Sequence, residues 1–580
     1  MQVFKAPVNR MRLFSGVPAR TAQPVRTVER AQMTATIQLG PRLSVEPTEG
    51  VGHDGAAQDS AEWNSATWDG AGCDGGLSFA DIVAVARDGA RVELTAAALD
   101  ALSAGRATVD KLAAAPTPAY GISTGFGALA TRHIDPELRA ALQRSLIRSH
   151  AAGMGELVEP EVVRALMLMR LKTLASGHTG VRPVVAETMA ALLNSGITPA
   201  VREYGSLGCS GDLAPLSHVA LVLMGEGEVI DDEGKAVDAA PVLAAHGIAP
   251  VQLEPKEGLA LINGTDGMLG MLILALRDFQ QLLKLADLTA AMSVEALLGT
   301  DRVFRPELHA IRPHPGQAAS AANLLRLLED SGVVASHRDP DCNRVQDAYS
   351  LRCAPQVAGA ARDTLAHAAL VAKRELAAIV DNPVVLLGED RVESNGNFHG
   401  APVGFVLDFL AVAVAEVGSI AERRTDRMLD VARSHGLPPF LAHDPGVDSG
   451  LMIAQYTQAA LVSENKRLAV PASVDSIPSS AMQEDHVSMG WSAARKLRTA
   501  LGNLTRILTV ELVTAARALE LRAPLRPAPG TAAAVAVLRA NGVGGPGPDR
   551  YLSLELRAAE RVVRDGSVLA AVEEIVGGLR

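Results

Sequence analysis

The sequence predicts a mainly α-helical protein in which long helices pack in a bundle and only a few short strands occur. Aromatic residues make up 3% of the 580 residues, whereas sheet sandwiches and barrels depend on aromatic and β-branched side chains. Two stretches contain no proline, 268–304 and 481–523. Each is longer than an ordinary globular helix, and helices of this length are typical of a large bundle. In the second stretch apolar residues follow helical spacing along one face: Leu501, Leu504, Ile507, Leu508, Leu512 and Leu519.

Residues 1–76 are predicted to form an extension outside the ordered protein. From residue 34 to 76 the sequence is rich in Gly, Asp, Ser, Ala and Glu without a sustained apolar period, which is typical of disordered acidic segments. The first 28 residues carry basic residues and no acid, as organellar targeting segments do, but prolines interrupt any helix there. A misplaced start, with Met33 as the alternative, is the competing interpretation.

Residues 77–267 and 268–580 are expected to form two regions of one compact unit. The ordered part of the sequence begins near Leu77, and a helix-like pattern of apolar residues continues through Leu112. The second region holds the long bundle helices. Within it, strand-like pieces at 384–387 and 391–393 flank a Gly-Glu-Asp turn and predict a minor hairpin.

Composition excludes several classes of protein. With 48% hydrophobic and 21% charged residues the chain is globular, and a net charge of -11 argues against a nucleic-acid partner. The longest wholly apolar run, 267–276, is shorter than the roughly 20 residues that a bilayer requires, so no membrane partner is expected. The cysteines form no CxxC pair, which fits the reducing cytoplasm: Cys73, Cys209, Cys342 and Cys353.

The most specific pattern is the segment 205–218, GSLGCSGDLAPLSH. Glycines on both sides of Cys209-Ser210 indicate a tight turn with an unhindered backbone. A serine-hydrolase elbow needs Gly-x-Ser-x-Gly, and here Gly211 follows Ser210 directly, so that spacing fails. The histidines and acids of the chain show no HExxH motif or compact ligand spacing, and we expect no metal site.

This segment resembles the cyclising loop of the aromatic amino acid ammonia-lyases, and the similarity runs from about Leu77 into the C-terminal region. The resemblance implies a fumarase-like bundle of long helices. It also implies that Cys209, Ser210 and Gly211 condense into 4-methylidene-imidazole-5-one (MIO), with no external cofactor. The amide nitrogen of Gly211 must then reach the carbonyl carbon of Cys209, which a residue without a side chain allows most easily. Cys209 stands where the family more often has Ala, and it supplies backbone and a small side chain only.

The resemblance also assigns residues around the electrophile. Tyr120 matches the tyrosine proposed to remove the β-proton, which requires a pKa below its usual value near 10. Arg352 matches the residue that holds the substrate carboxylate through a bidentate fork. Asn263 and Tyr349 would hold the amino group or the MIO carbonyl, and Gln346 would support MIO polarisation.

Two positions favour histidine as the substrate. Ser149-His150 stands where phenylalanine lyases have an aromatic residue and then Leu, and it resembles the histidine-specific members. Glu484 offers a hydrogen-bond partner to imidazole that a phenyl ring could not use. Phe398 matches a residue that packs beside the substrate ring.

The expected activity is therefore conversion of L-histidine into trans-urocanate and ammonia, the first step of histidine degradation. The resemblance further implies a homotetramer whose active sites combine more than one subunit, with helix N-termini directed at the MIO group. Alternatives are a phenylalanine or tyrosine ammonia-lyase, an aminomutase on the same scaffold, or a catalytically silent paralogue. Loss of Ser210, Tyr120 or Arg352 would mark the last, and all three are present.

Overall fold

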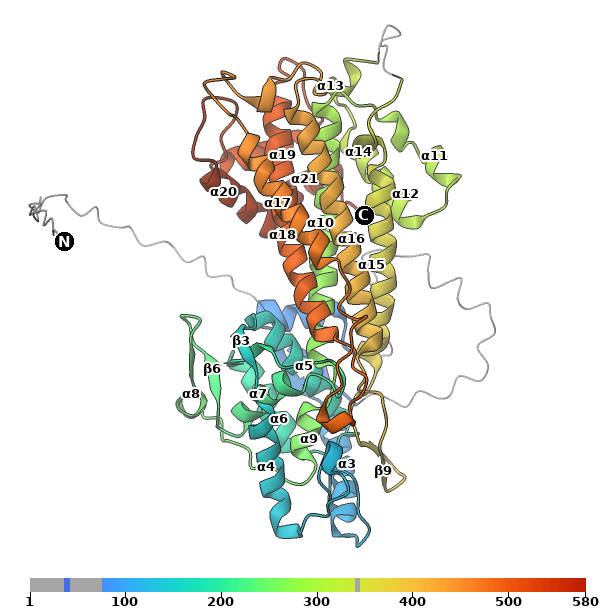
Figure 1. Ribbon diagram of the computed structural model, residues 1–580, viewed down its shortest axis with the longest axis vertical. Coiled ribbons are helices and arrows are strands. Elements are labelled where there is room, and N and C mark those ends of the chain that lie inside the picture. The colour runs from blue at the N-terminus through green and yellow to red at the C-terminus, as the bar shows by residue number, and fades with distance from the viewer. Residues whose placement is uncertain (1–35, 42–75, 339–344) are drawn as a thin grey trace, which may run out of the picture. The chain divides into compact units, whose positions relative to one another are not determined.

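The computed structural model describes residues 36–41, 76–338 and 345–580. Residues Thr36–Arg580 form one compact unit, which is mainly helical, as the sequence predicts (Figure 1).

The N-terminal region of this unit consists of short and medium helices around the loop 205–212. Its helices and helical turns are α2 (Phe79–Val83), η3 (Ala84–Asp88), α3 (Ala96–Ala114), η4 (Gly127–Leu129), η5 (Pro136–Leu138), α4 (Arg139–His150), α5 (Pro160–Ala175), α6 (Pro183–Asn194), α7 (Leu213–Leu223), α8 (Ala239–Ala245) and α9 (Glu257–Ile262).

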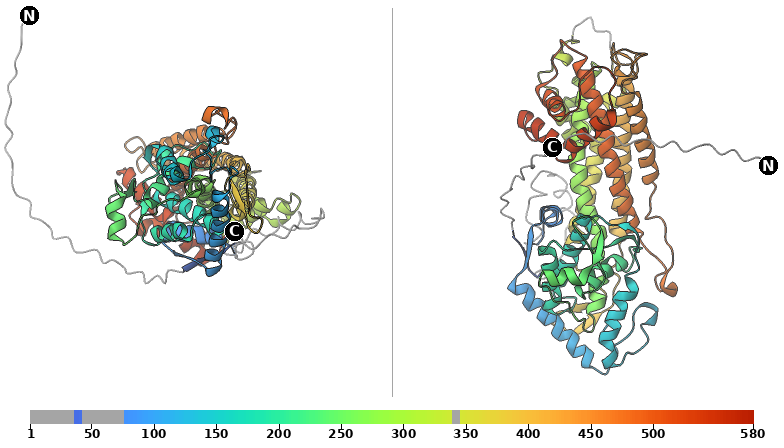
Figure 2. Two further views of the ribbon diagram at one scale, coloured as in Figure 1. Left: turned by 90° about the horizontal axis from the view of Figure 1, so that it is seen from below. Right: turned by 90° about the vertical axis from the view of Figure 1, so that its left-hand side faces the viewer.

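Long helices form the bundle of the C-terminal region and run side by side in Figures 1 and 2. They are α10 (Asp266–Ala296), α15 (Ala354–Ala377), α16 (Ala401–Leu429), α17 (Met452–Leu468) and α18 (Gly490–Glu520). Shorter helices and turns at the ends of the bundle are η6 (Arg302–Phe304), α11 (Pro306–Ala310), α12 (Pro315–Leu327), α13 (Gly332–Ala335), α14 (Tyr349–Arg352), η7 (Pro439–Leu441), η8 (Ser480–Met482), α19 (Pro529–Ala540), α20 (Leu552–Arg564) and α21 (Ser567–Val576).

The predicted stripe of α18 lies in the core, where the helix packs against α10 and α16. Its six residues are at most 5% exposed. The two proline-free stretches give helices that begin and end inside the expected bounds, apart from the first two residues of α10. That helix stops because Leu298 and Gly299 leave the helical path, Leu298 with φ +51°. The second stretch becomes helical only at Gly490, after the loop that contains Glu484.

The strands are short and lie at the edges of the helical layers. β1 (Thr36–Leu39) pairs in parallel with β2 (Arg91–Leu94). The antiparallel pairings join β3 (Met154–Leu157) to β5 (Arg202–Tyr204), β4 (Thr198–Pro199) to β6 (Glu228–Ile230) and β7 (Ala236–Asp238), and β8 (Val384–Leu386) to β9 (Arg391–Glu393). The last pair is the predicted hairpin, confirmed to within one residue.

Two details of the N-terminal prediction are wrong. Residues 36–39 belong to the ordered unit, because β1 pairs with β2 and buries Ile37 and Leu39. The stretch after Leu77 that the sequence predicts to be helical is interrupted by β2 before α3 begins. A strand of four residues is too short to show a clear alternation of apolar and polar residues, so the sequence alone does not separate it from a disordered segment. Residues 1–35 and 42–75 lie outside the described residues.

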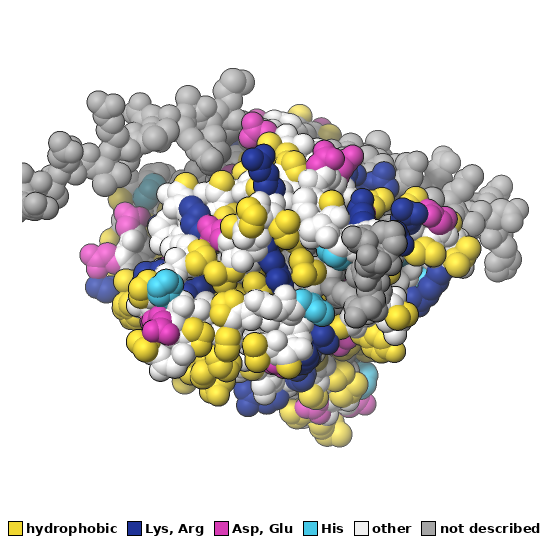
Figure 3. All heavy atoms as spheres, turned by 90° about the horizontal axis from the view of Figure 1, so that it is seen from above, with side chains coloured by type: hydrophobic (Ala, Val, Ile, Leu, Met, Phe, Trp, Pro, Cys, Tyr) yellow, Lys and Arg dark blue, Asp and Glu magenta, His cyan; other side chains and the backbone are white. Residues whose placement is uncertain are grey.

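Two apolar helical stretches are long enough to span a membrane, Glu257–Ala296 and Ala401–Leu429. The apolar window of the first is fully buried inside the protein and that of the second is 67% buried. Both are therefore core helices of the bundle. On the end of the bundle seen in Figure 3, the described basic, acidic, histidine and hydrophobic side chains are interspersed, unlike the continuous cationic face of a nucleic-acid-binding protein.

Candidate active site

The loop 205–212 takes a backbone path that two glycines permit. Gly208 and Gly211 have φ of +66° and +89°, in the left-handed region that side chains disfavour. A Cβ on Gly211 would lie 2.3 Å from the backbone nitrogen of Gly264, and one on Gly208 would lie 2.4 Å from Ser488 Oγ. The loop therefore lies directly against two segments that are distant in sequence.

Backbone hydrogen bonds from later parts of the chain fix this loop. The Leu207 carbonyl accepts from Met489 N at 2.9 Å, and the Gly208 carbonyl accepts from Gly400 N at 3.1 Å. The hydroxyl of Ser488 also donates to the Gly208 carbonyl. Residues 400 and 488–489 thus complete the environment of the loop.

Asp212 connects the loop to the start of α10. Its buried carboxylate accepts from Ser206 Oγ at 2.8 Å and from the backbone nitrogens of Gly267 and Met268 at 2.8 and 3.0 Å. Burial raises the pKa of Asp212 to about 7, while these hydrogen bonds act in the opposite direction. The helices α7 and α10 both begin beside the loop, but Asp212 occupies the first amides of α10. The prediction that helix N-termini point at the MIO group therefore needs a qualification at α10, because the Asp212 carboxylate already binds the first amides of that helix.

Ser210 and Cys209 both contact Glu484. Ser210 Oγ donates to Glu484 Oε1 at 2.8 Å, and Cys209 Sγ lies 3.4 Å from Glu484 Oε2. Burial, and next the negative charge of Glu484, raise the pKa of the Cys209 thiol to about 12. The thiol therefore remains protonated at neutral pH and is a poor nucleophile.

We expect Cys209→Ala to keep the activity within about threefold of the parent, because the thiol contributes one weak contact to Glu484. The same reasoning predicts slow alkylation of Cys209 at pH 8, measured by peptide mass after iodoacetamide treatment. The free, less buried Cys353 is the internal comparison. Rapid alkylation of Cys209, or inactivity of the alanine variant, would show that the thiol has a chemical role.

His150 and Phe398 lie near the same loop. Burial lowers the pKa of His150, although the neighbouring charge of Glu484 acts to raise it. His150 Nδ1 lies 3.1 Å from Ser149 Oγ. Phe398 precedes the segment whose Gly400 binds the Gly208 carbonyl, and it is half-buried. An imidazole and a carboxylate thus lie beside the Ser210 loop.

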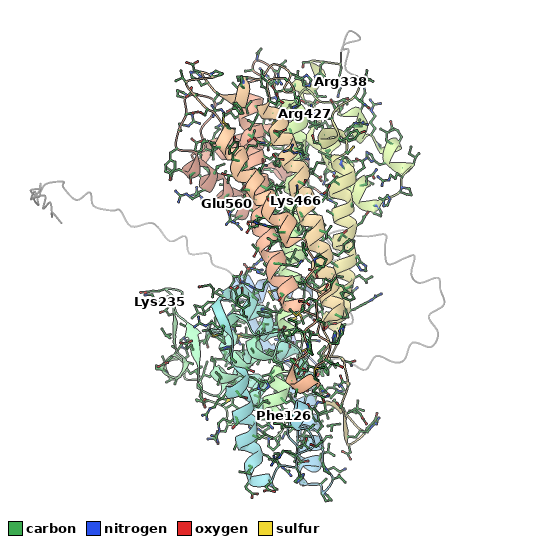
Figure 4. All side chains as sticks on the ribbon, in the orientation of Figure 1. Phe126, Lys235, Arg338, Arg427, Lys466 and Glu560 are labelled. Carbon is green, nitrogen blue, oxygen red and sulfur yellow. The ribbon has the colours of Figure 1, made fainter. Side chains whose placement is uncertain are left out.

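Tyr120 approaches from the turn before η4. Its hydroxyl oxygen accepts a hydrogen bond from Gly127 N at 3.3 Å. The turn η4 contacts η8, which belongs to the loop that carries Glu484. Figure 4 labels Phe126 of this turn at the end of the molecule that contains α3, α4 and α9.

Asn263 is held at the end of α9, next to the glycine that faces Gly211. Its Nδ2 donates to the Asn382 carbonyl at 2.8 Å, whereas its buried Oδ1 has no hydrogen-bond partner among the described residues. The guanidinium of Arg170, fully buried, donates to the carbonyl of Asn263 at 2.9 Å and pairs with Asp266 at 3.3 Å. An unpaired buried oxygen is costly, so Asn263 Oδ1 is suited to receive a donor from a bound molecule.

Three predicted site residues lie elsewhere in the chain. Gln346, Tyr349 and Arg352 lie on or just before α14, at the opposite end of α10 from the Ser210 loop (Figure 1). Asp347 binds Thr300 N at 2.7 Å, beyond the C-terminal end of α10, whereas Asp212 binds the N-terminal end. Since α10 has 31 residues, the two groups are about 45 Å apart within one chain.

The α14 group faces outward. Tyr349 is 72% exposed, and the Arg352 guanidinium lies over its ring at 4.7 Å. Arg352 Nε is buried and has no hydrogen-bond partner within the part of the chain that the structure describes. These side chains cannot meet Ser210 in the same chain.

Sequence reasoning gave no role to three residues that hold the site together. Asp212 holds the loop, Arg170 holds Asn263, and Ser479 holds Glu484. A signal existed for Arg170, because it is a charge within the apolar helix α5 and such a charge needs buried partners. Among the described residues, no group of three or more His, Cys, Asp or Glu is placed to hold a metal ion.

Comparison with known proteins adds independent findings. Residues 77–540 match the family model described as aromatic amino acid lyase. The histidine ammonia-lyase of Streptomyces coelicolor is 70% identical over 505 residues, which cover 87% of this chain and 98% of that protein. The solved tyrosine aminomutase of Streptomyces globisporus superposes with a TM-score of 0.81 at 39% identity, covering 87% of this chain and 98% of that one. The histidine ammonia-lyase of Trypanosoma cruzi gives 0.78 at 37%, covering 86% and 94%.

Proposed function

The chain belongs to the aromatic amino acid lyase family, and from this premise we propose that it acts as a histidine ammonia-lyase, converting L-histidine into trans-urocanate and ammonia. The observation that carries the proposal is the 70% identity over nearly the whole length of a histidine ammonia-lyase. The reaction is a carbon-nitrogen lyase step that opens histidine degradation. The test is a direct assay of urocanate formation by its ultraviolet absorbance.

The loop 208–211 fits the MIO group expected of this family. The positive φ of Gly211 and its contact with Gly264 leave room for a ring only if residue 211 has no side chain. The Ser210 hydroxyl, which must leave during ring formation, is held by Glu484. When formed, MIO supplies an electrophilic methylene that no ordinary side chain offers.

We expect the mature chain to be lighter than its sequence mass by two water molecules, one from ring closure and one from Ser210. Intact-mass spectrometry measures this difference, and a tryptic peptide spanning 208–211 locates it. An unmodified mass would favour the catalytically silent alternative, despite the presence of Ser210, Tyr120 and Arg352.

The other residues bind the substrate and move its proton. Tyr120 is the proposed β-proton base, and its oxygen accepts a hydrogen bond from Gly127 N. Asn263 Oδ1 offers an acceptor to the substrate amino group. Arg352, which keeps an unsatisfied Nε, clamps the carboxylate, with Tyr349 and Gln346 beside it on the same segment.

Glu484 and His150 account for the choice of imidazole over phenyl. The lowered pKa of His150 keeps its ring neutral near pH 7, so it can accept or donate a hydrogen bond. Glu484 Oε1 can accept from a substrate ring N–H once Ser210 has lost its hydroxyl, and a phenyl ring would leave that oxygen without a donor. Phe398 is assigned to packing beside the ring. Turnover of phenylalanine or tyrosine, or formation of β-amino acids, in preference to urocanate would favour the lyase or aminomutase alternatives.

A homotetramer would bring the two separated groups together. The α14 residues of one subunit would meet the Ser210 loop of another, which the separation along α10 requires. Exposed apolar side chains on one face of α16 are available for subunit contact: Phe405, Phe409 and Val412. We place the enzyme in the cytoplasm, where thiols such as Cys209 and Cys353 remain reduced.

A further inference from the structure

The loop from Ser479 to Glu484 is closed on itself and strained. Ser479 N donates to the Glu484 carbonyl at 2.9 Å, and Glu484 N donates back to the Ser479 carbonyl at 3.3 Å. Between them Ser480, Ala481 and Met482 have φ of +52°, +52° and +69°. Three successive non-glycine residues in the left-handed region persist only where surrounding contacts hold them, and such strain collects at functional sites.

The two oxygens of the Glu484 carboxylate have different hydroxyl partners. Ser479 Oγ donates to Oε2 at 2.9 Å, while Ser210 Oγ donates to Oε1 at 2.8 Å. MIO formation removes the Ser210 oxygen as water in the elimination that accompanies ring closure. Oε1 then loses its partner, and Oε2 keeps the hydrogen bond from Ser479.

The loop also touches the turn that carries the proposed base. The turn η8 packs on η4, and a Cβ on Gly127 would come within 3.2 Å of Ser480 Oγ. Gly127 N is the donor to the Tyr120 hydroxyl. One closed loop therefore adjoins both Glu484 and Tyr120.

We propose that Ser479 is a positioning residue that fixes the Glu484 carboxylate through Oε2, so that Oε1 is directed at the imidazole of the substrate once Ser210 has lost its oxygen. This proposal rests on the proposed function, because the imidazole to which Oε1 is directed belongs to the proposed substrate, L-histidine. Ser479 itself does not touch the substrate. Its effect is confined to ligands that have a ring N–H.

The experiment compares two inhibitors in Ser479→Ala: urocanate, and trans-cinnamate, which carries the same acid chain on a phenyl ring. We expect the inhibition constant of urocanate and the KM of L-histidine to rise about 10-fold, the size expected for one lost hydrogen bond to a charge. The inhibition constant of cinnamate should stay within about twofold. Ser479→Thr, which retains the hydroxyl, should restore urocanate affinity.

Two further variants make the test decisive. Ser479→Cys keeps the side-chain size with a much weaker donor and serves if the alanine variant does not fold. Ser476→Ala is the matched control, because Ser476 Oγ accepts from Val487 N at 3.0 Å in the same segment without contacting Glu484. It should leave both inhibitors unchanged. Intact mass verifies that each variant has lost two waters.

Equal weakening of urocanate and cinnamate would indicate a general loosening of the loop and overturn the proposal. An unchanged urocanate constant in Ser479→Ala and Ser479→Cys, or a ring that fails to form in them, would also overturn it. Failure of the parent enzyme to deaminate L-histidine would instead refute the proposed function.

Discussion

Replacement of Ser210 by alanine is expected to reduce L-histidine turnover by at least about 10³-fold, because without that hydroxyl oxygen the electrophilic methylene cannot form. The fold should survive. Ser210 is only partly buried and makes one side-chain hydrogen bond, to Glu484, so the expected stability change is about 1 kcal/mol. Urocanate formation measures the activity, and circular dichroism with thermal unfolding measures the fold.

The matched control is Ser217→Ala on the adjoining helix α7. Its hydroxyl donates only to the Leu213 carbonyl at 2.7 Å within the same helix, so activity should stay within about twofold of the parent. Retention of activity by Ser210→Ala would refute the assignment of the electrophile. Collapse of its thermal transition would mean that the lost activity reports unfolding.

Mixed subunits should recover activity that neither parent variant has. Ser210→Ala and Arg352→Ala are each expected to be inactive, because one lacks the electrophile and the other lacks the carboxylate clamp. If a site takes Ser210 from one chain and Arg352 from another, co-expression in equal amounts gives about a quarter of the sites both intact residues. Turnover per active-site loop should therefore reach about a quarter of the parent value.

The negative control for this experiment pairs Ser210→Ala with Glu484→Ala. Ser210 Oγ and Glu484 Oε1 are 2.8 Å apart in one chain, so each site takes both residues from the same chain. Every site in that mixture therefore lacks one of the two residues, and the mixture should stay inactive. Inactivity of the first mixture as well, with mixed oligomers verified by mass, would place Arg352 and Ser210 in the same chain and contradict the separation along α10.

The parts of the fold that local chemistry determines were predictable. The long helices follow from proline-free apolar periodicity, and the turn at Gly208 and Gly211 follows from residues that alone tolerate its backbone. The match to a known family supplied the activity. The roles of individual site residues stay predictions.

Other features depend on contacts between distant segments. The pairing of β1 with β2 joins four-residue strands across more than fifty positions, and no local pattern specifies it. Ser479 resembles any loop serine until Glu484 folds back on it. The position of α14 relative to Ser210 follows from the length and path of α10, which is why three residues matched by motif fall outside the cluster within one chain.

The loop contacts also set the order of events during biosynthesis. The turn that we propose to cyclise is braced by Gly400, Ser488 and Met489, and all three leave the ribosome long after residues 208–211. A nascent chain that ends before residue 488 lacks the braces from Ser488 and Met489, so the turn gains its full set of contacts only after the start of α18 has been synthesised.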